Sequence, residues 1–219
     1  MSSEIILISD PRVVAVPVRD EGEALVDVSD HLLVDDRKNP DFGGAEVYLR
    51  QGVLDRLVQA QKLLPAGLRL LFVEGYRPPS LQRAIFDDYS SGLRALHPDW
   101  SAEQIRSAAS RYVSPPEIGP HTAGAAVDLT LADADGRELD MGSPFDATPE
   151  ESDGACYTDA ANISEEARAN RKVLGAALSD AGMVNYPTEW WHWSYGDRYW
   201  ALMTGAPAAL YGPRELDAQ

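Results

Sequence analysis

Histidine is scarce in this chain, and two of its four histidines have neighbours that could do chemistry with them. The 219-residue sequence contains His31, His97, His121 and His192. His121 lies in GPHTAGAAVDLTL, seven residues before Asp128, and glycine and proline on both sides of it bend the chain back toward that carboxylate. With His192 as a third ligand, two imidazoles and one carboxylate would leave one tetrahedral position open, as in a catalytic zinc site. His31 and His97 have no comparable neighbourhood and are interpreted as loop histidines.

A second group of residues surrounds His192, in the stretch TEWWHWSY at 188–195. Glu189 stands three residues before His192, where an apolar strand begins, and a carboxylate there is costly to bury unless it is paired or working. The three adjacent tryptophans would exclude water, which raises a carboxyl pKa toward the range of a general base. The stretch could also be a core strand in which the tryptophans only pack.

Arg77 is the third chemically suggestive residue, in the turn EGYRPP that follows an apolar run. Two prolines fix the backbone after it. Arg77 could be a surface residue that pairs with Glu74. It could also be a rigidly placed cation that holds a carboxylate or a developing oxyanion.

Periodic apolar residues predict the elements that must position these groups. We expect helices at 45–64, 80–96, 101–113 and 164–182. We expect strands at 68–73, 125–131 and 190–195. Serines at 80, 101 and 164 are predicted to cap their helices, with Glu103 one residue short of the capping-box spacing. In strand 125–131, alternation places Asp128 on the face opposite Val127 and Leu129.

The remaining segments carry weaker patterns. The short apolar runs IILI and VVAVPV, within the first forty residues, indicate short strands or extended edges broken by proline. Residues 132–163 form a long polar stretch, and loops of that length carry function or hide a hairpin. The tail after Trp200 is expected to be loosely ordered.

The order of these elements predicts one domain, residues 1–219, of the α+β class. Strands and helices do not alternate regularly, so a small, mainly antiparallel sheet flanked by helices is expected rather than a parallel sheet. The chain is long enough to bury a core of its own.

Composition excludes several classes of protein. The net charge of −16, from 19 basic and 35 acidic residues, would repel nucleic acid. No apolar run approaches 18 residues, so no membrane span is expected, and the N-terminus shows no signal peptide, so a cytoplasmic location is predicted. The single cysteine, Cys156, excludes a zinc site of several thiolates and is interpreted as a buried apolar filler.

Four motifs in this order resemble a known family: EGYRP, HTAGAAVDLTL, MGSPFD and EWWHW. Over residues 40–200 the chain is similar to zinc D-alanyl-D-alanine dipeptidases of the vancomycin-resistance type, and the fold implied is that of zinc D-Ala-D-Ala peptidases and hedgehog-like domains. The resemblance implies one Zn²⁺ per chain held by His121, Asp128 and His192. It implies Glu189 as catalytic base and Arg77 as the residue that stabilises the transition state. It also implies a small dipeptide substrate, bound with the help of Arg77 and Asp128, and a role in cell-wall metabolism.

One position departs from the family pattern. The zinc motif usually opens with a serine two residues before its histidine, and that position is Gly119 here. Because this serine helps to recognise the amino end of the substrate, strict specificity for D-alanyl-D-alanine is not expected of a chain with glycine at this position. The change of the usual aspartate to Glu74 is milder.

The sequence is therefore compatible with three candidate functions. The first is hydrolysis of D-alanyl-D-alanine or a related dipeptide. The second keeps the metal but acts on longer cell-wall peptides, as a D,D-carboxypeptidase or endopeptidase. The third is a metal-holding binding or signalling domain without turnover, against which Glu189 and Arg77 argue. A homo-oligomer is compatible with the sequence, which gives no oligomeric state.

Overall fold

The computed structural model describes residues 5–36, 42–110 and 113–216, which form an α+β fold around a five-stranded sheet. The strand order is β2-β4-β5-β7-β6, with bounds Leu33–Val34, Arg69–Glu74, Ala126–Ala132, His192–Ser194 and Val184–Asn185. Only the β2–β4 pair is parallel within this sheet. The predicted small, mainly antiparallel sheet is therefore confirmed.

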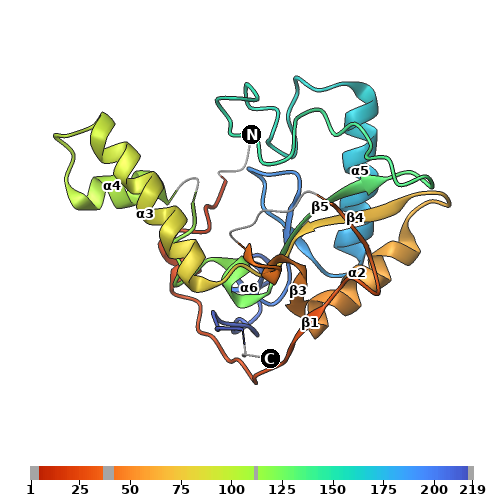
Figure 1. Cartoon of the computed structure of the whole chain (residues 1–219), viewed down its shortest axis with the longest axis horizontal. Helices are drawn as coiled ribbons and strands as arrows, with labels where there is room; N and C mark the ends of the chain where they lie inside the picture. Colours follow the sequence, from red (N-terminus) through yellow and green to blue (C-terminus); the bar gives the residue numbers. More distant parts are fainter. Residues whose placement is uncertain (1–4, 37–41, 111–112, 217–219) are drawn as a thin grey trace.

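Helices cover the sheet unequally (Figure 1). Helices α2 (Gln51–Leu63) and α5 (Glu165–Asp180) pack against each other and against β4 and β5. Helices α3 (Pro79–Leu96) and α4 (Ala102–Ala109) form a hairpin that extends away from the sheet. The remaining helical segments are short: α1 (Pro11–Val14), α6 (Arg198–Thr204), and the 3-10 helices η2 (Ala45–Val47) and η3 (Pro120–Ala123). A separate two-stranded sheet pairs β1 (Leu25–Asp27) with β3 (Tyr48–Arg50).

The two faces of β5 differ in polarity. Val127, Leu129 and Leu131 are fully buried in the main core together with side chains of α2 and α5. Asp128 and Thr130 point the other way, as the alternation of a strand requires. The expected separation of an apolar face from a polar face is confirmed, and Asp128 lies on the polar one.

A β-bulge in β4 brings a second carboxylate to that polar face. Phe72 pairs with Leu129 on the core face, so regular alternation would also turn Glu74 toward the core. The register shifts between Phe72 and Glu74, and Glu74 instead lies opposite Asp128. One extra residue in the strand thus turns this side chain to the other face.

Several helix predictions are confirmed, with changes at their ends. Ser164 caps α5 and Ser101 caps α4. The capping box that seemed one residue out of register at Glu103 is complete, because Gln104 rather than Glu103 is its third-position partner. Ser80 does not cap α3. The cap is Pro78, and Pro79 takes the first helical position, where a missing N–H costs nothing.

Other predictions were wrong at the edges of the chain. The expected helix at 45–64 begins only at Gln51, since Tyr48–Arg50 pair with β1. Pro11–Val14 form a helical turn because Asp10 accepts a hydrogen bond from the Arg12 amide. The tail after Trp200 is ordered: α6 follows at once, and Ala209 and Tyr211 are buried. The long polar stretch 132–163 was expected to carry function or to hide a hairpin, and its first residues do form a short hairpin, in which Glu138 pairs with Ala132.

No helix in the described ranges is long and apolar enough to cross a membrane.

Candidate active site

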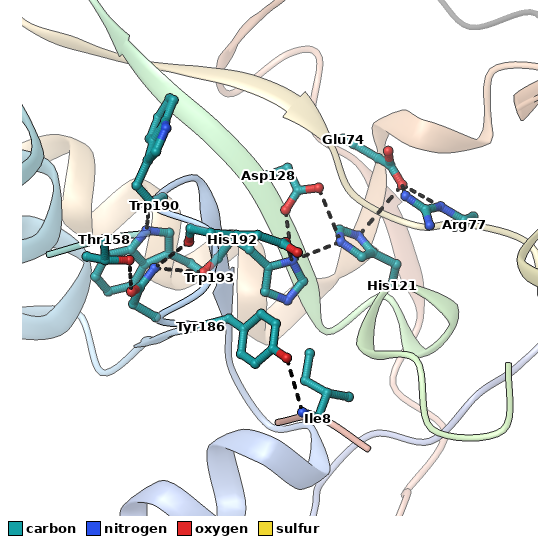
Figure 2. A network of polar contacts seen from close by, with 12 residues as sticks. Ile8, Glu74, Arg77, His121, Asp128, Thr158, Tyr186, Trp190, His192 and Trp193 are labelled. Atoms are coloured by element: carbon teal, nitrogen blue, oxygen red, sulfur yellow. Dashed lines mark hydrogen bonds and ion pairs between the residues drawn. The ribbon is translucent and has the colours of Figure 1, made fainter. Parts of the chain in front are cut away.

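Three side chains from distant parts of the chain converge in one buried cluster (Figure 2). Nδ1 of His192 lies 2.9 Å from Oδ1 of Asp128 and 3.2 Å from Nε2 of His121. Nε2 of His121 lies 3.3 Å from Oδ2 of Asp128. All three residues are buried. Burial of a carboxylate and two imidazoles costs free energy unless they are paired with one another or bind a cation.

The spacing of these atoms fits a metal ion. Ligand atoms bound at about 2.0–2.1 Å in a tetrahedral zinc site are about 3.3 Å from one another. Here the two ring nitrogens are 3.2 Å apart, and the Asp128 carboxylate presents Oδ1 to His192 at 2.9 Å and Oδ2 to His121 at 3.3 Å. Two nitrogens and one carboxylate oxygen are also the donor types that zinc prefers, and three protein ligands leave one position open. These residues would therefore hold a single divalent ion with room for a reactant.

The position of His121 is fixed by a reciprocal backbone contact. Its ring Nδ1–H donates to the carbonyl of Gly75 at 2.7 Å, which leaves Nε2 free to face Asp128 and His192. The carbonyl of His121 in turn accepts a hydrogen bond from the amide of Arg77 at 3.2 Å. A ligating histidine generally needs such an outer partner to set its tautomer and ring orientation. The turn after β4 supplies it here.

A buried arginine, Arg50, holds the backbone of the segment that carries His121. Arg50 is fully buried, and its Nε donates to the carbonyl of Ala123 at 2.8 Å. Its other nitrogens contact the carboxylate of Asp20 and the carbonyl of Gly212. Gly124 then turns with φ +64°, a conformation that strains any residue with a side chain, and a Cβ there would lie 2.3 Å from a methyl group of Leu25.

Arg77 pairs with Glu74, as one interpretation of the sequence predicts, but it is largely buried rather than a surface residue. Its guanidinium lies 2.6 Å from the Glu74 carboxylate, and the same side chain lines the cavity at the metal cluster. Gln82, which is buried, accepts from Nη1 of Arg77 at 2.9 Å and donates to the carbonyl of Ser114. These contacts hold the cation in one orientation beside His121.

Glu189 lies on the other side of the cluster. Its Oε2 is 3.9 Å from Nδ1 of His192, and it lines the same cavity. Burial, together with the carboxylates of Asp128 and Asp146, raises the pKa of Glu189 to about 7, although His192 and Arg77 oppose the rise. A carboxyl group with such a pKa is suited to accept and return a proton near neutral pH.

Asp146 is a residue of this cavity that sequence reasoning did not single out. It belongs to the MGSPFD motif within the long loop, and it has φ +61°, an unusual conformation for a residue with a side chain. Desolvation and the carboxylates of Asp128 and Glu74 raise its pKa to about 6. The motif itself was the available signal, but nothing in its spacing showed that it would reach the metal cluster.

The cavity at the cluster has a volume of about 370 Å³ and draws its walls from several elements. Besides the ligands, it is lined by Ile8, Phe42, Tyr89 and Tyr186. Tyr186 packs edge-on against the ring of His192, and its hydroxyl accepts a hydrogen bond from the amide of Ile8 at 3.4 Å. The N-terminal segment thus closes one side of the cavity. None of these wall residues carries a sequence signal of its own.

A buried two-histidine, one-aspartate cluster with a high-pKa glutamate and an arginine around one cavity defines a metallohydrolase centre. Comparison with known families gives the particular class. The family model described as D-ala-D-ala dipeptidase matches residues 45–204. The chain belongs to this family of peptidases.

Two curated relatives carry the same description. The D-alanyl-D-alanine dipeptidase of Synechocystis sp. is 30% identical over 217 residues, covering 85% of this chain and 87% of that protein. The D-alanyl-D-alanine dipeptidase of Escherichia coli K12 is 31% identical over 128 residues, covering 58% of this chain and 55% of that protein.

Among solved structures, the similarity is more distant. A mutant of the vancomycin-resistance D,D-pentapeptidase VanY in complex with Zn(II) is 16% identical, with a TM-score of 0.43 and 94% of each chain covered. The LD-carboxypeptidase LdcB is 19% identical, with a TM-score of 0.47 over 85% of this chain and 75% of the other.

Proposed function

We propose that this protein is a zinc-dependent dipeptidase that hydrolyses D-alanyl-D-alanine or a related dipeptide containing D-amino acids. The observation that carries the proposal is the convergence of His121, Asp128 and His192 in one buried cluster, with Glu189 and Arg77 on the same cavity. Family membership supports the peptide substrate.

The ion would be held by Nε2 of His121, a carboxylate oxygen of Asp128 and Nδ1 of His192. Zinc in such a site supplies Lewis-acid chemistry, in that it polarises a carbonyl group and acidifies water. The neighbouring histidines lower the pKa of Asp128 although burial opposes this, so the carboxylate stays ionised as a ligand must.

Glu189 is assigned the proton transfers. Its carboxylate takes a proton from the water that attacks the peptide carbonyl carbon and delivers it to the nitrogen of the leaving amino acid as the C–N bond breaks. Arg77 is assigned to stabilise the negative charge that develops on the carbonyl oxygen. Its fixed contacts with Glu74 and Gln82 mean that little reorientation is needed at that step.

Asp146 is proposed to anchor the amino end of the substrate. Its carboxylate faces the cavity, and a free ammonium group there would be paired with a negative charge. Its left-handed backbone conformation is strained, and strain of this kind gathers at ligand sites. Because Asp146 and Glu189 line the same cavity, an ammonium group held by Asp146 would favour cleavage of the first peptide bond over internal peptide bonds.

The test combines metal analysis with hydrolysis. The purified protein, loaded with one equivalent of zinc, is assayed on D-Ala-D-Ala, L-Ala-L-Ala and a pentapeptide that ends in D-Ala-D-Ala, with and without chelator. We expect chelator-sensitive cleavage of D-Ala-D-Ala and at least hundredfold lower kcat/KM on the pentapeptide. Preference for the pentapeptide would instead establish the D,D-carboxypeptidase alternative, and no cleavage of any peptide would contradict the proposal.

The cytoplasmic location and a possible homo-oligomer stay predictions from the sequence, and we keep them as part of the proposal. Cell fractionation and the molar mass measured by light scattering test them separately.

A further inference from the structure

A second cavity adjoins the candidate active site and has no part in the chemistry described above. Its volume is about 350 Å³. It shares four wall residues with the cavity at the metal cluster: Asp146, Thr148, Glu189 and Trp191. The two spaces therefore meet at the two carboxylates that the proposed function assigns to the amino end of the substrate and to the proton transfers.

Apart from the shared residues, five of the residues that line the second cavity are apolar, and Tyr157 and Thr188 add polar groups. Ile5 and Leu7 of the N-terminal segment form one wall, and Ala147, Pro149 and Cys156 belong to the opposite loop. The Cys156 side chain is buried, and its predicted role as an apolar filler is consistent with this position. An apolar group of several carbons would be better accommodated here than a charged one.

The covalent structure of a dipeptide decides which part of it would reach this cavity. In the proposed binding mode, Asp146 holds the ammonium group, and Glu189 stands at the scissile bond. The atom between the ammonium nitrogen and the scissile carbonyl carbon is the α-carbon of the first residue. This α-carbon therefore lies between Asp146 and Glu189, which both also line the second cavity, and one of its two configurations directs the side chain toward that cavity.

We propose that the second cavity is a binding site for the side chain of the first substrate residue, and that the enzyme accepts dipeptides with a large apolar first residue. The inference rests on the proposed dipeptidase function and names its substrate class more narrowly. Ile5 and Leu7 lie outside the segment 45–204 that matches the family, so this wall is not set by the family pattern.

The experiment compares four substrates on the zinc-loaded enzyme: D-Ala-D-Ala, D-Leu-D-Ala, D-Ala-D-Leu and L-Leu-D-Ala, the last of which covers the other configuration. One methylene in an apolar pocket changes kcat/KM by roughly 10–200-fold when it fits or fails to fit. We expect at least one leucyl-D-alanine to be cleaved with kcat/KM equal to or above that of D-Ala-D-Ala.

Two variants fill the cavity from opposite walls. Ala147→Phe and Leu7→Trp should each lower kcat/KM for leucyl-D-alanine at least tenfold more than for D-Ala-D-Ala and for D-Ala-D-Leu. Leu96→Phe, at an exposed position of α3, is the matched control and should leave all the ratios unchanged. Calorimetric titration of zinc-loaded Glu189→Gln protein, which should bind without turnover, should show the same order of affinities.

The outcomes separate the two proposals. Cleavage of D-Ala-D-Ala without cleavage of either leucyl-D-alanine would overturn the side-chain site and leave the dipeptidase function intact. The same conclusion follows if both filling variants fold, as judged by circular dichroism, and change kcat/KM by the same factor for all substrates. Absence of all dipeptide cleavage would overturn the dipeptidase function, and the side-chain site with it.

Discussion

Asp128 and His192 lie directly opposite each other in β5 and β7, and Oδ1 of the first is 2.9 Å from Nδ1 of the second. Two of the three candidate ligands are therefore placed by strand pairing, and only His121 lies outside the sheet, on the short 3-10 helix η3. A site built on paired strands is held more rigidly than one built on loops alone.

Loss of a ligand should remove the metal while the fold remains. Asp128→Asn keeps the size of the side chain but removes its charge, and His192→Ala removes a nitrogen ligand. Even outer-shell changes cost 10–100-fold in metal affinity, so we expect at least that loss for each variant. Zinc content by mass spectrometry and competition with a chromogenic chelator measure it. His97→Ala, which removes only a ring stacked on Trp100, should bind zinc normally.

Glu189→Gln should separate metal binding from catalysis. The amide has nearly the same shape as the carboxylate but cannot accept the proton from water, so we expect one zinc per chain and a loss of kcat of at least a hundredfold, since general acid–base catalysis contributes about 10²–10⁴-fold. A variant with wild-type turnover would exclude Glu189 as the base.

Arg77→Ala should act on turnover through the lost cation. Removal of one oxyanion donor costs about 3–4 kcal/mol of barrier, or roughly 10²–10³ in kcat. Arg77→Lys keeps the charge but cannot hold Glu74 and Gln82 at once, so it should recover only part of the rate. The control is Arg106→Ala, which removes an exposed ion pair with Glu117. Equal rates for Arg77→Ala and the control would refute the assigned role.

Gly119→Ser should change specificity rather than stability. A Cβ at Gly119 would lie 3.5–3.6 Å from its nearest neighbours, an ordinary contact, and the residue lines the main cavity. We expect the added hydroxyl to raise kcat/KM for D-Ala-D-Ala relative to longer or bulkier substrates, and to leave the thermal midpoint within a few degrees. If the substrate ratios did not move, the hydroxyl at this position would not contribute to recognition.

The Asp20–Arg50 pair should make the protein sensitive to acid. Burial of Asp20 opposes ionisation, but amide hydrogen bonds from Gly212 and Gly22, together with Arg50, lower its pKa overall. A lowered folded-state pKa adds stability above the unfolded value of about 3.9, and this stability is lost as the pH falls through the folded value. Urea denaturation at pH 5 and pH 3 should show a smaller pH dependence for Asp20→Asn than for the wild type. If the free energy of unfolding fell as much between pH 5 and pH 3 in Asp20→Asn as in the wild type, this assignment would be contradicted.

The sequence predicted the parts of the site that rest on local pattern. Alternation along residues 125–131 correctly placed Asp128 opposite the core face, and the apolar stretch at 190–195 correctly indicated the strand of His192. The contact of Glu74 with this face could not be predicted in the same way, because it depends on a bulge. Tertiary contacts also decide where α2 begins, since the preceding residues Tyr48–Arg50 pair with β1 instead of joining the helix.

Asp146 and the walls of both cavities were not predictable because they come from irregular segments. The loop that carries Asp146 is held by Arg171, which donates to the carbonyls of Met141, Ala155 and Tyr157. Such contacts with backbone carbonyls select no particular partner residue, so they leave no trace in the spacing of side chains.

Arg50 has a consequence for the order in which the protein matures. It joins the backbone just after His121 to Asp20 near the beginning of the chain and to the carbonyl of Gly212 near its end. During synthesis, this clasp cannot close until residue 212 has left the ribosome. A growing chain would already contain all three candidate ligands while the segment of His121 is still only partly held, so full metal affinity would be acquired only after residue 212 has emerged.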